Sequence, residues 1–323
     1  MKKFALKLII FSIPFILFLS IPKIWPFSFD RELDIKIRTF LPEPDSVEVI
    51  IAGDSRAERS LIPEVFIKRL GLNTVNIAKG VGNLISLYKT FQKYGLLIDS
   101  HIVIISASIW QINDGAVSYG YISQNELIEM PFWGQIKLMK LQYPRYLLER
   151  MRLIWDEMIG KYSTREFDVD DSRIGSHGFL AIESVLNQEK LSEISLDPNS
   201  TKHPFYTDFN MNGHRNKVFQ KALKLFNESG STIVIYKSPV SPAWRTYTEN
   251  SFISHHQNEF SEFLKQSVSQ YDNIHYLDLY NNQSTHLLND HFHDIQHLNV
   301  NGASIFTNAI IDSLIDRNII QRN

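Results

Sequence analysis

Short runs of β-branched residues alternate with helical stretches from residue 47 onward, and this alternation restricts the fold more than any other feature of the chain. The runs predict five strands, at residues 47–52, 74–78, 102–106, 232–236 and 274–279. Helices are predicted at Pro63–Leu70, Leu84–Tyr94, 219–226, 255–270 and 299–315. Strands alternating with helices indicate a mostly parallel sheet covered on both faces, so the predicted fold class is α/β.

The alternation stops between the third and fourth strands, roughly from residue 115 to residue 215, which is far longer than an ordinary loop. Residues 135–162 are rich in Leu, Met, Arg and Tyr and predict one or two helices, whereas residues 163–213 are polar and irregular. We therefore expect a largely helical insertion that caps or lines a substrate cleft. A lid that only covers apolar surface is an equally open alternative.

The N-terminus has the pattern of a transmembrane signal anchor. Lys2, Lys3 and Lys7 precede an apolar run at residues 8–22, and Trp25 follows it. As a helix counted from residue 4, the run would be about 28 Å long, close to the hydrocarbon thickness of a bilayer. Lysines before the run and a tryptophan after it predict a cytoplasmic N-terminus.

A cleaved signal peptide is the alternative, although no small-x-small cleavage site follows the apolar run. The predicted organisation is an anchor at residues 1–27, a connector at 28–46 that ends in a stiff Pro-Glu-Pro stretch, and an α/β domain at 47–323. This places the protein in the cytoplasmic membrane as a single-pass chain with its folded domain outside the cytoplasm.

Charge and cysteine content exclude several classes of function. The formal net charge of -2 offers nothing for a nucleic acid to bind, so no nucleic-acid partner is expected. The chain has no cysteine, which rules out disulfides, thiolate catalysis and cysteine-ligated zinc. No cofactor is predicted.

A Gly53-Asp54-Ser55 turn follows the first predicted strand. A serine in this position can present its hydroxyl at the edge of the sheet, and the N–H groups after the turn can face a developing oxyanion. Gly-Asp-Ser is also a common helix cap, which is the alternative for the tripeptide alone.

Asp294 and His297 follow the last predicted strand and precede the last predicted helix. A carboxylate three residues before a histidine can turn back to the imidazole and fix its tautomer, which leaves the other ring nitrogen free to take a proton from a serine. A polar surface loop is the alternative.

With Gly53-Asp54-Ser55 after strand one and Asp294-Ile-Gln-His297 before the final helix, the chain resembles an SGNH (GDSL-type) hydrolase. The resemblance covers residues 47–114 and 230–315. It implies a flavodoxin-like doubly wound sheet, with Ser55 as nucleophile, His297 as general base and Asp294 as its orienting carboxylate.

The resemblance also implies an oxyanion hole formed by Ser55, Gly80 and Asn113. Gly80 is preferred to Gly82 on spacing. The family's Gly-x-Asn-Asp is missing after the third strand, so Asn113 comes several residues late and Ser108 is an alternative donor. Loss of one such donor typically lowers the rate by about 10²–10³.

Two other groups of polar residues suggest a metal site and an anion-binding site. His291, His293, Asp294 and His297 could form a metal site, but no second ligand group is visible, so no metal is predicted. Arg56 could bind an anionic group, although a solvated helix face with Glu58 pairing locally is the preferred interpretation.

The leading functional hypothesis is a serine O-acyl, most simply O-acetyl, esterase or acyltransferase that acts on a cell-envelope polysaccharide. Its expected substrate is an acylated envelope glycan or a small ester. The alternatives are a lipase or thioesterase, and a non-catalytic anchored glycan-binding or assembly protein. A further hypothesis is a partner of a multi-pass membrane acyltransferase.

Overall fold

The computed structural model describes residues 31–41, 43, 46–80, 82, 84–96, 102–115, 173–193, 206, 209–280 and 285–321. The predicted anchor at 1–27 and most of the predicted insertion, including its helices, lie outside the described residues. No helix in the described part is both long and apolar enough to cross a bilayer.

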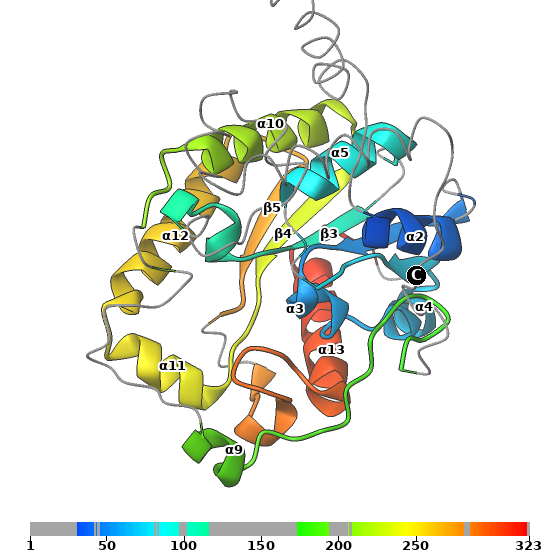
Figure 1. The fold of residues 1–323 in the computed structure, drawn as a ribbon. Coiled ribbons are helices and arrows are strands. Elements are labelled where there is room, and N and C mark those ends of the chain that lie inside the picture. The colour runs from blue at the N-terminus through cyan, green and yellow to red at the C-terminus, as the bar shows by residue number, and fades with distance from the viewer. Residues whose placement is uncertain are drawn as a thin grey trace, which may run out of the picture.

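Five parallel strands form one sheet in the order β2-β1-β3-β4-β5, which is the flavodoxin-like order (Figure 1). The strands are β1 (Val49–Ala52), β2 (Thr74–Asn76), β3 (Ile102–Ala107), β4 (Thr232–Lys237) and β5 (Ile274–Asp278). Their boundaries differ from the predicted ones by two residues or fewer. The α/β prediction is confirmed.

Both faces of the sheet are covered by helices, as Figure 1 shows. In β1, Ile50 packs into one apolar cluster with α5 (Leu84–Tyr94), α10 (His214–Glu228) and α12 (Ile253–Val268). Ile51 faces the other way, into a cluster with α4 (Pro63–Leu70) and α13 (Val300–Asp316). Because both sides of each central strand are buried, the strands appear in the sequence as continuous apolar runs.

The predicted connector at 28–46 is not extended over its whole length. It contains helix α2 (Arg31–Phe40), whose Leu33 and Ile37 are buried in the same cluster as α5. These two residues and Leu41 recur at the four-residue spacing of a helix face, but charged residues stand between them. The helix therefore belongs to the folded domain.

Residues 173–187, here called the strap, are the best described part of the predicted insertion, and in Figure 1 they run as a green segment from near α4 toward α9 (Gln188–Glu193). The backbone of the strap bonds to that of the domain at Leu180 N–Glu58 O (3.1 Å), Val300 N–Ile182 O (2.8 Å) and Leu186 N–Phe292 O (2.6 Å). Phe179 and Leu186 are buried in the cluster around α13. This part of the insertion therefore covers apolar surface.

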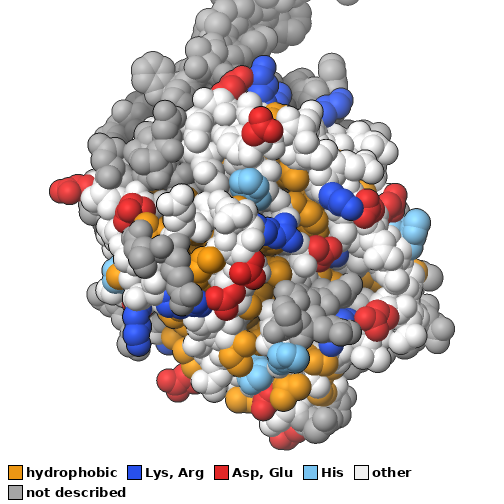
Figure 2. Space-filling view, turned by 180° about the vertical axis from the view of Figure 1, so that it is seen from behind, with side chains coloured by type: hydrophobic (Ala, Val, Ile, Leu, Met, Phe, Trp, Pro, Cys, Tyr) orange, Lys and Arg blue, Asp and Glu red, His pale blue; other side chains and the backbone are white. Residues whose placement is uncertain are grey.

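Helix α11 (Pro242–Glu249), which follows β4, was not predicted. The helix predicted at 219–226 is present as α10, which begins five residues earlier, at His214. On the side seen in Figure 2, acidic and basic side chains of the described residues are interspersed among apolar ones, without a broad field of one sign.

Candidate active site

Ser55 is the first residue of α3 (Ser55–Glu58), directly beyond the carboxyl end of β1. Gly53 makes the turn with φ 125°, and a Cβ there would lie 2.2 Å from Ser106 Oγ, so only glycine fits. Asp54 caps the helix by accepting from Arg56 N at 3.1 Å. The Gly53-Asp54-Ser55 turn therefore both caps a helix and presents the serine, two roles that the sequence offered as alternatives.

The Asp54 carboxylate points inward and joins the turn to the end of β3. Ser106 Oγ donates to Asp54 Oδ1 at 2.9 Å, and Ser108 Oγ donates to Oδ2 at 2.5 Å. Asp54 N donates in turn to Ser106 Oγ at 3.1 Å. Since Asp54 is buried and its oxygens are satisfied, its role is to hold the backbone from which Ser55 projects.

The loop with Asp294 and His297 lies between η6 (Asn289–His291) and α13. An isolated bridge pairs Phe292 with Leu298, and His293 N donates to His297 O at 2.8 Å, so the loop is closed at its base. Asn299 then starts α13 as a cap, accepting from Gly302 N at 3.0 Å. A cap directly after the loop fixes where the loop ends.

The structure brings Ser55, His297 and Asp294 together. Ser55 Oγ lies 2.7 Å from His297 Nε2, although the two residues are 242 positions apart in the chain. On the other side of the ring, Nδ1 lies 2.8 Å from Asp294 Oδ2 and 3.0 Å from Oδ1. A hydroxyl, an imidazole and a carboxylate in contact in this spatial order can serve as a nucleophile, its general base and the carboxylate that orients the base.

Asp294 is held in its ionised form. Its partial burial favours the neutral acid, but the hydrogen bond and charge of His297 and the N–H groups of Gln296 (2.8 Å) and His297 (2.9 Å) outweigh burial and keep the pKa well below its usual range. An ionised carboxylate only accepts, so Nδ1 carries the proton. Nε2 is then the basic nitrogen that faces Ser55.

Two of the predicted oxyanion donors have backbone N–H groups that bond to none of the described residues. The Ser55 N–H is the first of α3 and has no acceptor among the described residues. The same holds for the Gly80 N–H, and a Cβ on Gly80 would meet nothing within 4 Å. Gly82 is unsuitable, because its N–H donates to Lys79 O at 3.1 Å.

Asn113 and Ser108 are engaged elsewhere. Asn113 is fully buried, and its Oδ1 accepts from Gly115 N (3.0 Å) and Asn210 N (2.8 Å). Ser108 donates to Asp54. Nothing in the described contacts brings either side chain to Ser55, so the role of Asn113 in an oxyanion hole stays a prediction.

The expected solvated face at Arg56 and Glu58 is wrong, because α3 is a buried helix. Arg56 is 8% exposed, and its Nη2 donates to Gln296 Oε1 at 2.5 Å, inside the loop that carries His297. Sequence reasoning had not singled out Gln296. Its position between Asp294 and His297 was the available signal.

Glu58 pairs with Lys36 from α2 rather than with a neighbour on its own helix. Lys36 Nζ lies 2.6 Å from Glu58 Oε1, and both side chains are buried. The same ammonium donates to Ala78 O, two residues before Gly80. Lys36 thus joins the Ser55 helix to the segment that leads to Gly80, and nothing in the sequence marked it.

The remaining histidines of the loop have separate contacts. His291 Nδ1 accepts from Leu288 N at 3.0 Å, and His293 contacts Ser184 of the strap. Burial is the main cause that lowers the pKa of His293. Within the residues that the structure describes, no three potential ligands gather closely enough to hold a metal ion.

No family model matches the chain, and no curated protein matches it. A solved structure described as that of "a putative platelet activating factor from Streptococcus pneumonia" is similar over 89% of this chain and 92% of that chain. The sequence identity is 10% and the TM-score is 0.42, so the similarity carries no argument about function.

Proposed function

We propose that the protein is a serine-dependent O-acyl, most simply O-acetyl, esterase or acyltransferase acting on a cell-envelope polysaccharide. The observation that carries the proposal is the continuous chain of contacts from Ser55 Oγ through the His297 ring to the ionised Asp294. The resemblance of the two motifs to those of SGNH hydrolases supports the same chemistry.

The reaction begins when Ser55 Oγ attacks the ester carbonyl carbon while its proton passes to His297 Nε2. Asp294 stabilises the imidazolium that forms. The Ser55 and Gly80 N–H groups are the candidate donors to the oxyanion. As the tetrahedral intermediate collapses, the carbon–oxygen bond to the alcohol breaks, the alcohol takes the proton from His297, and the acyl group stays on Ser55.

The second half of the reaction removes the acyl group from Ser55. His297 takes a proton from water in an esterase, or from a sugar hydroxyl in a transferase, and that oxygen attacks the acyl-enzyme carbonyl. The new bond replaces the bond to Ser55 Oγ, which recovers its proton. Which acceptor is used depends on how far water is excluded from the site.

The envelope as the place of action rests on the sequence alone. An anchor at 1–27 with a cytoplasmic N-terminus would hold the site on the outer side of the cytoplasmic membrane, where acylated glycans are the accessible esters. Protease added to intact spheroplasts should then cleave the folded domain. Protection of the domain until lysis would contradict this placement.

Chemical activity is tested with the full chain purified in mild detergent and an activated acetyl ester. Ser55→Ala should abolish both ester cleavage and labelling by a fluorophosphonate probe, whereas Ser304→Ala on α13 should change neither. Unchanged cleavage by Ser55→Ala would exclude Ser55 as the nucleophile. A folded wild type that neither cleaves nor is labelled would favour the non-catalytic alternative.

A further inference from the structure

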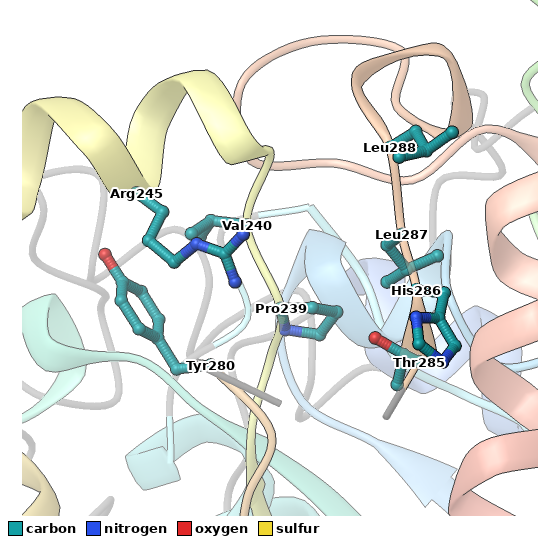
Figure 3. A pocket seen from close by; sticks show the side chains of 8 residues that line it. All are labelled: Pro239, Val240, Arg245, Tyr280, Thr285, His286, Leu287 and Leu288. Atoms are coloured by element: carbon teal, nitrogen blue, oxygen red, sulfur yellow. The ribbon is translucent and has the colours of Figure 1, made fainter. Parts of the chain in front are cut away.

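A pocket of about 360 Å³ lies beyond the carboxyl ends of β4 and β5. Figure 3 shows Arg245 of α11 and Tyr280 on one side, the segment that contains His286 and Leu288 on the other, and Pro239 between them. The volume is near the lower end of the roughly 300–1,000 Å³ of typical ligand sites. It therefore suits a group of about one sugar ring rather than a long acyl chain.

The pocket shares its framework with the loop that carries His297. Ser241, next to the lining residue Val240, donates its N–H to Ile295 O at 3.1 Å, and Ile295 directly follows Asp294. Ala243 N also donates to Asn289 Oδ1 at 3.1 Å, which joins the start of α11 to η6. A ligand group in the pocket would therefore lie beside the Asp294–His297 loop, at the same edge of the sheet as Ser55.

Arg245 gives this pocket its charge. Its side chain lines the pocket, and none of the described residues forms an ion pair or hydrogen bond with its guanidinium. A guanidinium matches the planar geometry of a carboxylate or the oxygens of a phosphate. A lining cation that pairs with none of the described residues indicates that the pocket favours an anion.

Two buried cations lie near the Tyr280 wall but do not line the pocket. Lys237 Nζ lies 4.3 Å from the centre of the Tyr280 ring and donates to Gln257 O and Ser261 Oγ, and burial lowers its pKa to about 8; the positive charge of Arg56 also acts on Tyr280. Two carboxylates oppose them, since Asp278 acts on Lys237 and Glu249 acts on Tyr280. Neither pairs with Arg245, although Glu249 lies only one helical turn further along α11.

The remaining walls suit the rest of such a ligand. Val240, Leu288 and the ring of Tyr280 offer apolar surface, and Leu288 is 59% exposed. His286 has φ 48°, in the left-handed region that residues other than glycine rarely adopt. Strained backbone of this kind is found at ligand sites more often than elsewhere.

We propose that this pocket binds an anionic group of the acylated substrate through Arg245, so that the enzyme prefers an acidic glycan to a neutral one. The inference rests on the proposed function, because the anion is placed on the same molecule as the ester. The shared chemistry is a carboxylate, as in a uronic acid, or a phosphate on a sugar.

Three acetyl esters of matched structure test the proposal: an O-acetylated glucoside, the corresponding glucuronide and the corresponding 6-phosphate. The wild type should show a KM about tenfold lower for at least one anionic ester than for the neutral one, which is the effect of about 1.4 kcal/mol. Whichever anionic ester shows it identifies the group. Equal KM values for all three would overturn the proposal while leaving the esterase intact.

Variants locate the effect. Arg245→Gln should raise KM for the anionic ester about tenfold, with kcat and the neutral ester unchanged. Arg317→Gln is the matched control, because it removes the same charge beyond α13, where Arg317 donates to Tyr276 O outside the pocket. A preference that survives Arg245→Gln, or is lost equally in Arg317→Gln, would contradict the assignment.

His286→Asn probes the opposite wall without new backbone strain, since asparagine tolerates the left-handed region. It should reduce the preference for the anionic ester by about two- to threefold, less than Arg245→Gln does. A loss larger than that of Arg245→Gln would show that the imidazole rather than the guanidinium is the main anion ligand, and would overturn the proposal.

Binding without turnover separates this proposal from the proposed function. Full-length Ser55→Ala protein is titrated with glucuronate, glucose 6-phosphate and glucose by NMR. Binding of an anion that depends on Arg245 would support the pocket even if no ester were cleaved. Absence of anion binding to Ser55→Ala at millimolar concentration, when the wild-type protein is labelled by fluorophosphonate, would overturn the pocket alone.

Discussion

The Ser55 turn and the Asp294–His297 loop are held in different ways. The turn directly continues the sheet, because it follows β1, which pairs with both β2 and β3. Buried side chains also hold the turn in place. The loop is a partly exposed excursion in which the Asp294 side chain is 39% exposed. It is closed by its own backbone and reaches the turn only through side chains.

The polar contacts of the turn and of the loop also differ in burial and in number. On the turn side, Asp54 and the Lys36–Glu58 pair are buried and fully engaged. On the loop side, His297 contacts Ser55 and Gln296 contacts Arg56. Changes on the turn side should therefore affect folding, whereas changes on the loop side should affect activity with little cost in stability.

His297→Ala should have the largest effect on activity. Without the base, kcat for an activated acetyl ester should fall by about 10⁵-fold or more. The midpoint of thermal unfolding should change little, because the ring is not part of a core cluster. Steady-state kinetics and calorimetry measure the two, and a fall in kcat of less than about 100-fold would argue against His297 as general base.

Asp294→Asn should lower kcat by about 10⁴-fold, because an amide can donate to Nδ1 and favour the wrong tautomer. The variant also tests the contribution of the carboxylate to stability. A lowered pKa in the folded state means that the stabilisation is complete above the unfolded pKa, near 3.9, and is lost as the pH falls below it.

The difference in unfolding free energy between wild type and Asp294→Asn should therefore shrink as the pH falls from about 5 to about 2. Urea unfolding across this range measures it. A difference that is independent of pH would mean that the ionised carboxylate does not stabilise the loop.

Lys36→Met should destabilise the fold by about 3–5 kcal/mol, because it leaves the Glu58 carboxylate buried without its partner. The double variant Lys36→Met/Glu58→Gln should recover most of the loss. Lys224→Met, on the exposed pair with Glu228, is the matched control and should cost about 1 kcal/mol or less. Equal losses in Lys36→Met and Lys224→Met would contradict a structural role for the buried Lys36–Glu58 pair on the turn side.

Gln296→Ala should have the smallest effect. It removes the acceptor of Arg56 Nη2, and loss of this hydrogen bond weakens docking of the loop by about 1.5 kcal/mol without unfolding the domain. We expect kcat/KM to fall about tenfold, with the pH profile unchanged. Gln270→Ala, two residues beyond the end of α12, serves as control, and a shifted pH profile would show that Gln296 acts on His297 instead.

Several features could be predicted because their cause is local in the sequence. The strands follow from β-branched runs, and Asp294 can reach His297 because only two residues of a tight loop separate them. The features that failed depend on neighbours from elsewhere. Arg56 and Glu58 were expected in solvent, since nothing near them in the chain shows that α2 and the loop cover α3. Helix α2 was not predicted for a similar reason. Its apolar face is narrow, and the polar residues Asp34 and Lys36 are buried by contacts with distant parts of the chain.

Short-range sterics and hydrogen bonds fix the order of strands and helices, the turn that presents Ser55 and the pairing of Asp294 with His297, so the amino-acid order alone was enough to predict them. The assembled fold was needed to show that Ser55 meets His297, that Lys36 neutralises Glu58, and that Arg245 lines a pocket beside the loop. Those contacts join residues far apart in the chain, so they exist only once the sheet has assembled and buried both of its faces.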